Sequence, residues 1–328
     1  MNYKLITFFI FVSLTIQMKF FRRSNEAQIS GGSIITIGTF DGVHIGHRTL
    51  VKKLIEDGNR LELETLVITF HPHPRLVLFP EQHDLRLLNT SQERAELLNL
   101  IGISQLVEFP FTKEFAEIDP TQFVTEILLQ QMRMKKIVLG YDHRFGKNRE
   151  GSLELMKQLS NRFNFEVEEI PAMEINSMNV SSTRIRKALQ SGEIELANQL
   201  LGYTYFFSGT IIKGKKLGRT LGYPTANIAG INPYKLIPAS GVYAVEVKVN
   251  NFIKKGMMNI GTNPTTDMDA SIKIEVNIFD FEEDIYNKEI TVYLKSFIRK
   301  EEKFAGLTEL KLALDLDKQK TLKIFGNV

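Results

Sequence analysis

The sequence contains no cysteine and carries almost no excess of charge of either sign. Without cysteine, disulfides, thiolate zinc sites and cysteine nucleophiles are excluded, and a reducing compartment is consistent with the chain. The 41 basic residues against 38 acidic ones leave a net charge of +3, too small to imply a polyanionic partner, although a local basic patch could still bind phosphates. A composition of 43% hydrophobic and 24% charged residues excludes disorder and collagen-like repeats. The 328 residues suffice for two domains of roughly 150 residues each.

Near the N-terminus, an apolar run from Leu5 to Ile16 follows a single Lys4. The run is shorter than the roughly 20 residues that a membrane-spanning helix needs, and no small-x-small cleavage site follows it. Two interpretations compete: a weak export signal, or an upstream extension of a chain that starts at Met18. We favour an extension over residues 1–17, because the sequence beyond it has the features of cytosolic nucleotide chemistry.

From residue 34 onward, short apolar strands alternate with helices. We expect strands at residues 34–38, 64–70 and 135–140. Helices are expected from about His47, from the capping box of Thr90 and Glu93, from Asp119-Pro120, and over residues 181–190. Strands separated by helices of this length predict βαβ units in a Rossmann-like α/β domain, whose parallel sheet binds ligands at the carboxyl ends of its strands.

After about Tyr203 the pattern changes to consecutive strands, expected at residues 241–250, 252–260, 272–281 and 289–297. Asn250-Asn251 is a plausible hairpin turn between the first two, and one amphipathic helix is expected from Leu307 to about Leu316. This order predicts a small antiparallel β-barrel. The expected domains are therefore an α/β domain over residues 18–187, a helical connector over 188–204 and a barrel over 205–328.

The first chemical motif, GTFDGVHIGH at residues 38–47, lies where a strand ends and a helix begins. The start of a helix offers unpaired N–H groups and the positive end of its dipole, which suits a phosphate chain. His44 and His47 would share one face of the first turn, where two imidazoles could stabilise charge on a triphosphate attacked at its α-phosphorus. Gly46 would let a phosphate approach the backbone, and the alternative is a glycine-rich turn with two surface histidines or a metal pair. The nucleotide-binding candidates in this motif are Gly38, Phe40, Asp41, Gly42 and Gly46.

Two further segments are expected at strand ends of the same sheet. His71 begins HPHP, which could contribute to the site or serve only as a rigid turn. SSTRIR at residues 181–186 opens a helix, where Ser182, Thr183 and Arg186 could hold the β- and γ-phosphates or merely cap the helix. Capping alone would need one hydroxyl, whereas this segment begins with three, so we favour phosphate binding.

In this order, GTFDGVHIGH, FHPHP, LGYDHRFGKNREG and SSTRIR resemble the FMN adenylyltransferase half of bacterial bifunctional riboflavin kinase/FAD synthetases. The glycine-rich segment GTIIKGKKLGRTLGYPTAN at residues 209–227 is similar to the riboflavin kinase loop with its PTAN motif. GVYAVEV, MNIGTNPT, IEVNIFDF and IRKEEKF follow in the family's order. The resemblance extends from about Met18 to Phe325.

The resemblance implies roles for further residues. It makes Glu275 the base that accepts the proton of the ribityl 5′-hydroxyl of riboflavin, whereas the strand pattern alone favours a surface glutamate. Thr225 and Asn227 would bind ATP with Mg²⁺, and Arg299 and Phe304 would contact the flavin. The other nucleotide-binding candidates are Asp142, Gly214, Lys216, Gly218 and Pro224. Two positions depart from the family pattern, His143 where phenylalanine is frequent and Asn277 where histidine is common.

The activity that the resemblance implies is bifunctional. Riboflavin and ATP would give FMN and ADP in the barrel, and FMN and a second ATP would give FAD and pyrophosphate in the α/β domain, with Mg²⁺ in each reaction. The expected partners are riboflavin, FMN and ATP, with no nucleic acid and no stable membrane association, in the cytoplasm. An oligomer is left open.

Three alternatives remain at this stage. A different HxGH nucleotidyltransferase could act on pantetheine phosphate or a pyridine mononucleotide, but neither chemistry needs the second ATP site that PTAN indicates. A nucleic-acid-binding barrel could use the KGKK stretch at residues 213–216, but its basic residues are interleaved with glycine rather than with stacking aromatics. A membrane-tethered form of the same enzyme would be held by residues 1–17.

Overall fold

The computed structural model describes residues 18–81, 85–141, 146, 151–171, 180–214, 217–250, 252–262 and 272–326. Contacts divide the chain into two compact units, each built from more than one segment. The first contains Met1–Thr39, Arg48–Glu81 and Ala95–Ala172, and the second contains Phe40–His47, Gln82–Arg94 and Met173–Val328. The HxGH motif therefore leaves the first unit after Thr39, and its histidines belong to the second.

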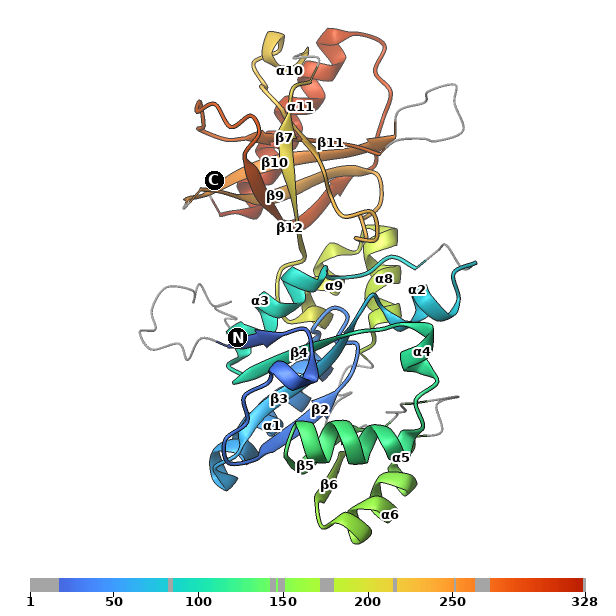
Figure 1. The fold of residues 1–328 in the computed structure, drawn as a ribbon. Helices are drawn as coiled ribbons and strands as arrows, with labels where there is room; N and C mark the ends of the chain where they lie inside the picture. The colour runs from blue at the N-terminus through green and yellow to red at the C-terminus, as the bar shows by residue number, and fades with distance from the viewer. Residues whose placement is uncertain are drawn as a thin grey trace. The chain divides into compact units, whose positions relative to one another are not determined.

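The first unit is built on a parallel sheet in the order β1-β4-β3-β2-β5-β6, visible in blue to green in Figure 1. Its strands are β1 Lys19–Phe21, β2 Ser33–Ile37, β3 Glu64–His71, β4 Gln105–Pro110, β5 Met134–Gly140 and β6 Glu166–Ile170. The chain adds β3 and β4 on one side of β2 and then β5 and β6 on the other, so the strand order reverses beside β2. Such a reversal is where open α/β sheets bind their ligands. This confirms the predicted parallel α/β fold.

Helices and one π-helical segment accompany this sheet: η1 Ser24–Glu26, α1 Ile45–Leu61, α2 Pro74–Leu78, α3 Ser91–Ile101, α4 Lys113–Ala116, α5 Pro120–Gln122, η2 Phe123–Gln131 and α6 Leu153–Phe163. α1 begins at Ile45, two residues before the predicted start. The capping box was correctly predicted, since the Thr90 amide donates to Glu93 at 2.8 Å and the Glu93 amide donates to Thr90 Oγ1 at 3.2 Å. Asp119 likewise caps α5.

Burial explains why these strands form. All five residues of β2 are buried, and so are most residues of β3 and β4, as expected for a parallel sheet covered on both faces. Alternate residues of β2 to β5 pack with η2 and α6 in one core, which includes Ile35, Ile68, Val107, Leu128 and Met156. Neither β4 nor β6 was expected from the sequence. β6 carries three glutamates in five residues, and such charge is tolerated at the edge of a sheet.

The second unit contains a closed antiparallel barrel in the strand order β10-β11-β8-β7-β12-β9, as predicted (Figure 1). Its strands are β7 Phe206–Ile212, β8 Ala226–Ala229, β9 Gly241–Val249, β10 Phe252–Thr262, β11 Ile272–Ile278 and β12 Glu289–Arg299, and α10 covers Leu217–Thr220. The final helix, α11, runs over Leu307–Ile324 and is longer than predicted. β11 ends at Ile278 rather than at Phe281, and β7 and β8 were not expected as strands.

Two helices precede the barrel, the first close to the helix predicted over residues 181–190 and the second within the predicted connector over 188–204. α8 covers Ser182–Ser191 and α9 covers Ile194–Leu201, and each ends at a glycine in the left-handed conformation. Their apolar residues, including Ile185, Leu189 and Leu200, share one core with the barrel interior. Within the described part of the chain, no helix is both long enough and apolar enough to span a bilayer.

Candidate functional sites

The HxGH loop is held in an unusual backbone conformation between β2 and α1. Phe40, Gly42 and Val43 have φ angles of 48°, 91° and 36°, all in the left-handed region. A Cβ on Gly42 would lie 2.6 Å from Leu88 Cδ1, so glycine is required there by both conformation and space. Phe40 and Val43 adopt this conformation although neither is glycine, and both side chains are buried. The packing around them therefore imposes the left-handed conformation.

Asp41 is the anchor of this loop. Its carboxylate accepts hydrogen bonds from the amides of Leu88 at 2.9 Å and Asn89 at 3.2 Å, and it forms an ion pair with Arg186. Burial raises the pKa of the Asp41 carboxyl, against the opposing effects of Arg186 and the two amides. The Ser182 hydroxyl donates to the Asp41 carbonyl at 2.8 Å. Two residues predicted to hold phosphates, Ser182 and Arg186, thus come together at the loop, and both bind Asp41.

The two histidines of the motif lie against each other. Their ring centroids are 3.6 Å apart at an angle of 13°, and the His47 amide donates to His44 Nδ1 at 3.3 Å. Burial lowers the pKa of His44 to about 4 and holds the pKa of His47 well below its ordinary value. Both imidazoles are therefore neutral near pH 7. His47 Nδ1 is buried without a hydrogen-bond partner among the described residues, which leaves a polar atom for a ligand.

The remaining candidates around this motif differ in setting. Thr183 is exposed in the first turn of α8, and Ser181, two residues earlier, is the residue that caps the helix. Gly38 extends the pairing of β2 by donating to the Ile68 carbonyl at 3.0 Å. His71 is exposed at the carboxyl end of β3, while His73 is buried and caps α2. Asp142, His143 and Lys216 lie outside the described residues.

A second polar cluster lies on the outer face of the barrel. Asn227 of β8, Glu275 of β11 and Asn259 of β10 are directly paired across three neighbouring strands, so their side chains share one face. The alternate residues Ile274 and Val276 point into the barrel core, which places Glu275 on the outside. Glu275 forms an ion pair with Lys273 at 2.8 Å. Sequence analysis named Glu275 and Asn227 as candidate site residues but did not name Asn259, whose place beside them depends on strand register.

The PTAN motif is fixed next to this cluster. Asn277 Nδ2 donates to the Pro224 carbonyl at 2.6 Å, and the Tyr223 hydroxyl bonds to Asp315 of α11. Asn277, one of the two departures from the family pattern, therefore holds the backbone of the motif. The glycine-rich segment packs closely here, because a Cβ on Gly214 would lie 2.1 Å from Asn227 Nδ2 and one on Gly218 would lie 2.2 Å from the Tyr223 carbonyl oxygen.

The two residues expected to contact flavin also lie together. The guanidinium group of Arg299 lies 5.5 Å from the centroid of the Phe304 ring. Asp317 of α11 is the main partner of Arg299, with hydrogen bonds to Nε at 3.0 Å and Nη2 at 2.8 Å. Arg299 pairs with Val242 of β9, which in turn pairs with Asn259, so Arg299 lies on the same outer face of the barrel as the polar cluster, separated from it by this valine.

The oxygens at this second cluster suit a magnesium ion. Thr225 offers an exposed hydroxyl, Asn227 an amide oxygen and Glu275 a carboxylate. Mg²⁺ accepts such hard oxygens together with substrate phosphates and does not require a closed protein cage. In the described part of the chain, no group of three or more histidine, aspartate or glutamate residues forms a metal site by itself.

Comparison with known proteins gives matches to both halves of the chain. The family model of FAD synthetase matches residues 26–184, and that of riboflavin kinase matches residues 201–325. A bifunctional riboflavin kinase/FMN adenylyltransferase from Listeria monocytogenes is 39% identical over 296 residues, covering 90% of this chain and 93% of its own length. The protein of the same name from Escherichia coli K12 is 35% identical over 300 residues, with the same coverage.

A solved structure resembles nearly the whole chain. The crystal structure of a protein named as a macrolide-efflux protein from Streptococcus pneumoniae superimposes with a TM-score of 0.84 at 32% identity. The match covers 93% of this chain and 98% of that one, so both units have counterparts in a single known polypeptide.

Proposed function

This chain belongs to the family of bifunctional riboflavin kinases/FMN adenylyltransferases, and we propose that its two reactions take place at the two clusters described above. It is an enzyme that phosphorylates riboflavin to FMN with ATP and adenylylates FMN to FAD with release of pyrophosphate. The observation that carries the assignment is that the two clusters contain different chemical groups. A carboxylate stands between two amide side chains on the barrel, and two neutral histidines stack at the start of α1.

The barrel cluster is proposed as the kinase site. Glu275 accepts the proton of the ribityl 5′-hydroxyl while that oxygen attacks the γ-phosphorus of ATP, and ADP leaves. Asn227 and Thr225 hold the phosphate end of ATP, and Gly214, which packs against Asn227, and Gly218, which packs against Tyr223, can contribute backbone N–H groups. Arg299 and Phe304 are proposed to border the flavin ring. We also propose that Thr225 and Asn227 bind Mg²⁺, which when bound neutralises charge on the phosphates.

The HxGH loop is proposed as the adenylyl-transfer site. The phosphate of FMN is already an anion, so it can attack the α-phosphorus of ATP without a general base. What the protein must supply is stabilisation of the charge that grows on the triphosphate as pyrophosphate leaves. Neutral His44 and His47 can each donate one hydrogen bond, and the amide groups at the start of α1 add the positive end of the helix dipole. In this account Asp41 and Arg186 hold the loop.

Two variants of the full chain test the assignment. Each is incubated with ATP and Mg²⁺ and with either riboflavin or FMN, and the flavins are separated by chromatography. His47→Ala should convert riboflavin to FMN and stop there. Glu275→Gln should leave riboflavin unchanged but still convert supplied FMN to FAD. Loss of both reactions in either folded variant would contradict two separate sites.

The location is proposed to be the cytoplasm, where ATP and Mg²⁺ are available for both steps. Cell fractionation, followed by detection of the chain in each fraction with an antibody, tests this directly. Recovery of the protein in the membrane fraction would favour the tethered alternative.

A further inference from the structure

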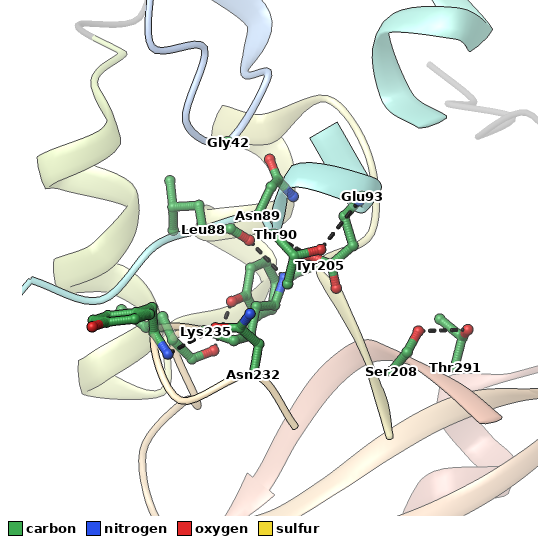
Figure 2. A network of polar contacts seen from close by, with 12 residues as sticks. Gly42, Leu88, Asn89, Thr90, Glu93, Tyr205, Ser208, Asn232, Lys235 and Thr291 are labelled. Atoms are coloured by element: carbon green, nitrogen blue, oxygen red, sulfur yellow. Dashed lines mark hydrogen bonds and ion pairs between the residues drawn. The ribbon is translucent and has the colours of Figure 1, made fainter. Parts of the chain in front are cut away.

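Lys235 is a buried lysine in the connection between β8 and β9 of the barrel. Its side chain is 1% exposed, and Nζ donates to the Leu88 carbonyl at 2.6 Å and to Glu93 Oε2 at 2.7 Å (Figure 2). The ammonium group also lies 4.5 Å from the centroid of the Tyr205 ring. Burial lowers the pKa of Lys235, which the Glu93 carboxylate opposes. An apolar residue of similar size would often serve a core equally well, so a paired lysine here calls for a specific purpose.

The bond to the Leu88 carbonyl points to that purpose. The peptide unit between Leu88 and Asn89 accepts from Lys235 through its C=O and donates to Asp41 through the Asn89 N–H at 3.2 Å. The Leu88 N–H donates to the same Asp41 oxygen at 2.9 Å. A hydrogen bond to the carbonyl polarises the peptide and strengthens the bond that its N–H makes. Lys235 therefore acts on Asp41 through one peptide unit.

The residues just before Leu88 are held from two sides, by the connection between β8 and β9 and by Arg186 of α8. Leu87 forms a parallel bridge with Lys235, with its N–H donating to the Tyr234 carbonyl at 2.6 Å and its C=O accepting from Leu236 at 2.8 Å. On the other side, the Arg86 carbonyl accepts from Arg186 Nε at 2.7 Å. The segment thus joins the barrel connection to the residues that anchor the HxGH loop.

Glu93 connects Lys235 to the start of helix α3. Its Oε2 accepts from both Lys235 and the Thr90 amide, so the lysine also binds the capping box that begins α3 (Figure 2). A second link reaches the loop directly, because the Tyr203 hydroxyl donates to the Gly42 carbonyl at 2.7 Å. The left-handed conformations of Phe40, Gly42 and Val43 are disfavoured in isolation and persist only where such contacts impose them.

We propose that Lys235 of the barrel is a positioning residue for FAD formation: it holds the Leu88–Asn89 peptide that orients Asp41, and through Asp41 the loop that presents His44 and His47. The inference rests on the proposed function of that loop as the adenylyl-transfer site. It makes the second reaction depend on a residue of the domain that performs the first.

The test compares the two reactions in the same full-length protein. In Lys235→Met, kcat for FAD formation from supplied FMN should fall roughly tenfold to a hundredfold, the loss expected when reacting groups shift slightly. The KM for FMN and the rate of FMN formation should stay within about twofold of the values for the unchanged protein. In this proposal Lys235 contacts neither the phosphate of FMN nor the kinase cluster. Lys235→Gln, which keeps a donor for the Leu88 carbonyl without the charge, should retain more FAD formation than the methionine variant.

The matched control is Tyr234→Ala, which changes the exposed neighbouring side chain and keeps the backbone bridge. It should leave both reactions unchanged. A proportional fall of both reactions in Lys235→Met and Lys235→Gln would show a purely structural role and overturn the inference, as would unchanged FAD formation in Lys235→Met. If His47→Ala still makes FAD, the proposed function of the loop fails instead, so the two failures are distinguishable.

Discussion

Lys235 and Asp41 bind opposite sides of one peptide unit, with the lysine on the Leu88 carbonyl and the aspartate on the Asn89 N–H. The two residues are far apart in the sequence, and the first belongs to the barrel while the second belongs to the HxGH motif. Between them they fix the segment that shapes a loop with three left-handed residues. The geometry of the adenylyl-transfer loop is therefore set by residues outside its own motif.

Replacement of Asp41 by asparagine should both destabilise the protein and impair FAD formation. The amide can still accept a hydrogen bond, but it leaves Arg186 without its carboxylate, and breaking a buried pair of this kind lowers the free energy of unfolding by roughly 3 kcal/mol. Urea denaturation measures the change. Glu282→Gln removes an exposed carboxylate and should have no effect. An unchanged unfolding midpoint for Asp41→Asn would contradict the anchoring role.

The histidine pair predicts a dependence of stability on pH. Because the pKa of His44 is about 4 in the folded chain and about 6.5 when unfolded, the unfolded state binds more protons between these values, and stability falls as the pH decreases through them. His44 alone should lower the free energy of unfolding by about 2 kcal/mol between pH 7 and pH 5. Denaturation at both pH values measures this.

The matching variants are His44→Gln and His71→Gln. The first should weaken the pH dependence by the His44 contribution, whereas the second removes an exposed histidine and should leave it as in the unchanged protein. Equal pH dependence in His44→Gln and the unchanged protein would show that the ring is not held neutral.

Two glycines of the barrel predict opposite outcomes for the same substitution. Gly218→Ala would place a Cβ 2.2 Å from the Tyr223 carbonyl oxygen, and a backbone atom cannot move aside as a side chain can. FMN formation should fall at least roughly tenfold through displacement of the PTAN segment. Gly306→Ala meets no atom within 4 Å and should leave FMN formation unchanged. Full kinase activity in Gly218→Ala would show that the segment does not need this close approach.

Asn277 should matter for the kinase reaction alone. Asn277→Ala removes the hydrogen bond to the Pro224 carbonyl, a loss of about 1 kcal/mol, so kcat/KM for ATP in FMN formation should fall about fivefold. FAD formation from supplied FMN serves as the internal control and should not change. A comparable loss in both reactions would point to general destabilisation rather than to placement of PTAN.

The sequence predicted the features that are local in the chain. The HxGH histidines are three residues apart, with His44 just before α1 and His47 in its first turn, and the capping box of Thr90 and Glu93 uses the same spacing, so both were recognised. Glu275 and Asn227 were identified through motifs. The parallel α/β fold was predicted from the alternation of expected strands and helices, and the barrel from the consecutive strands that come after them.

What the sequence did not reveal depends on contacts between distant segments. Lys235 and Leu88 are separated by 147 positions, and nothing near Lys235 distinguishes it from a surface lysine. Asn259 joins the polar cluster of Asn227 and Glu275 only through the register of β10 against β11. The buried Asp41, expected to bind nucleotide, has its carboxylate engaged by backbone amides and Arg186, which no local pattern indicates.

The central claim is that one chain uses ATP in two ways, with transfer of the γ-phosphoryl group at the barrel and of the adenylyl group at the HxGH loop. The most direct measurement supplies riboflavin, Mg²⁺ and ATP labelled with radioactive phosphorus at either the γ or the α position. With the γ label, both FMN and FAD should become radioactive; with the α label, FAD alone should, and His47→Ala should remove that signal. An α label that never enters a flavin, or riboflavin that stays unlabelled in both reactions, would contradict the account.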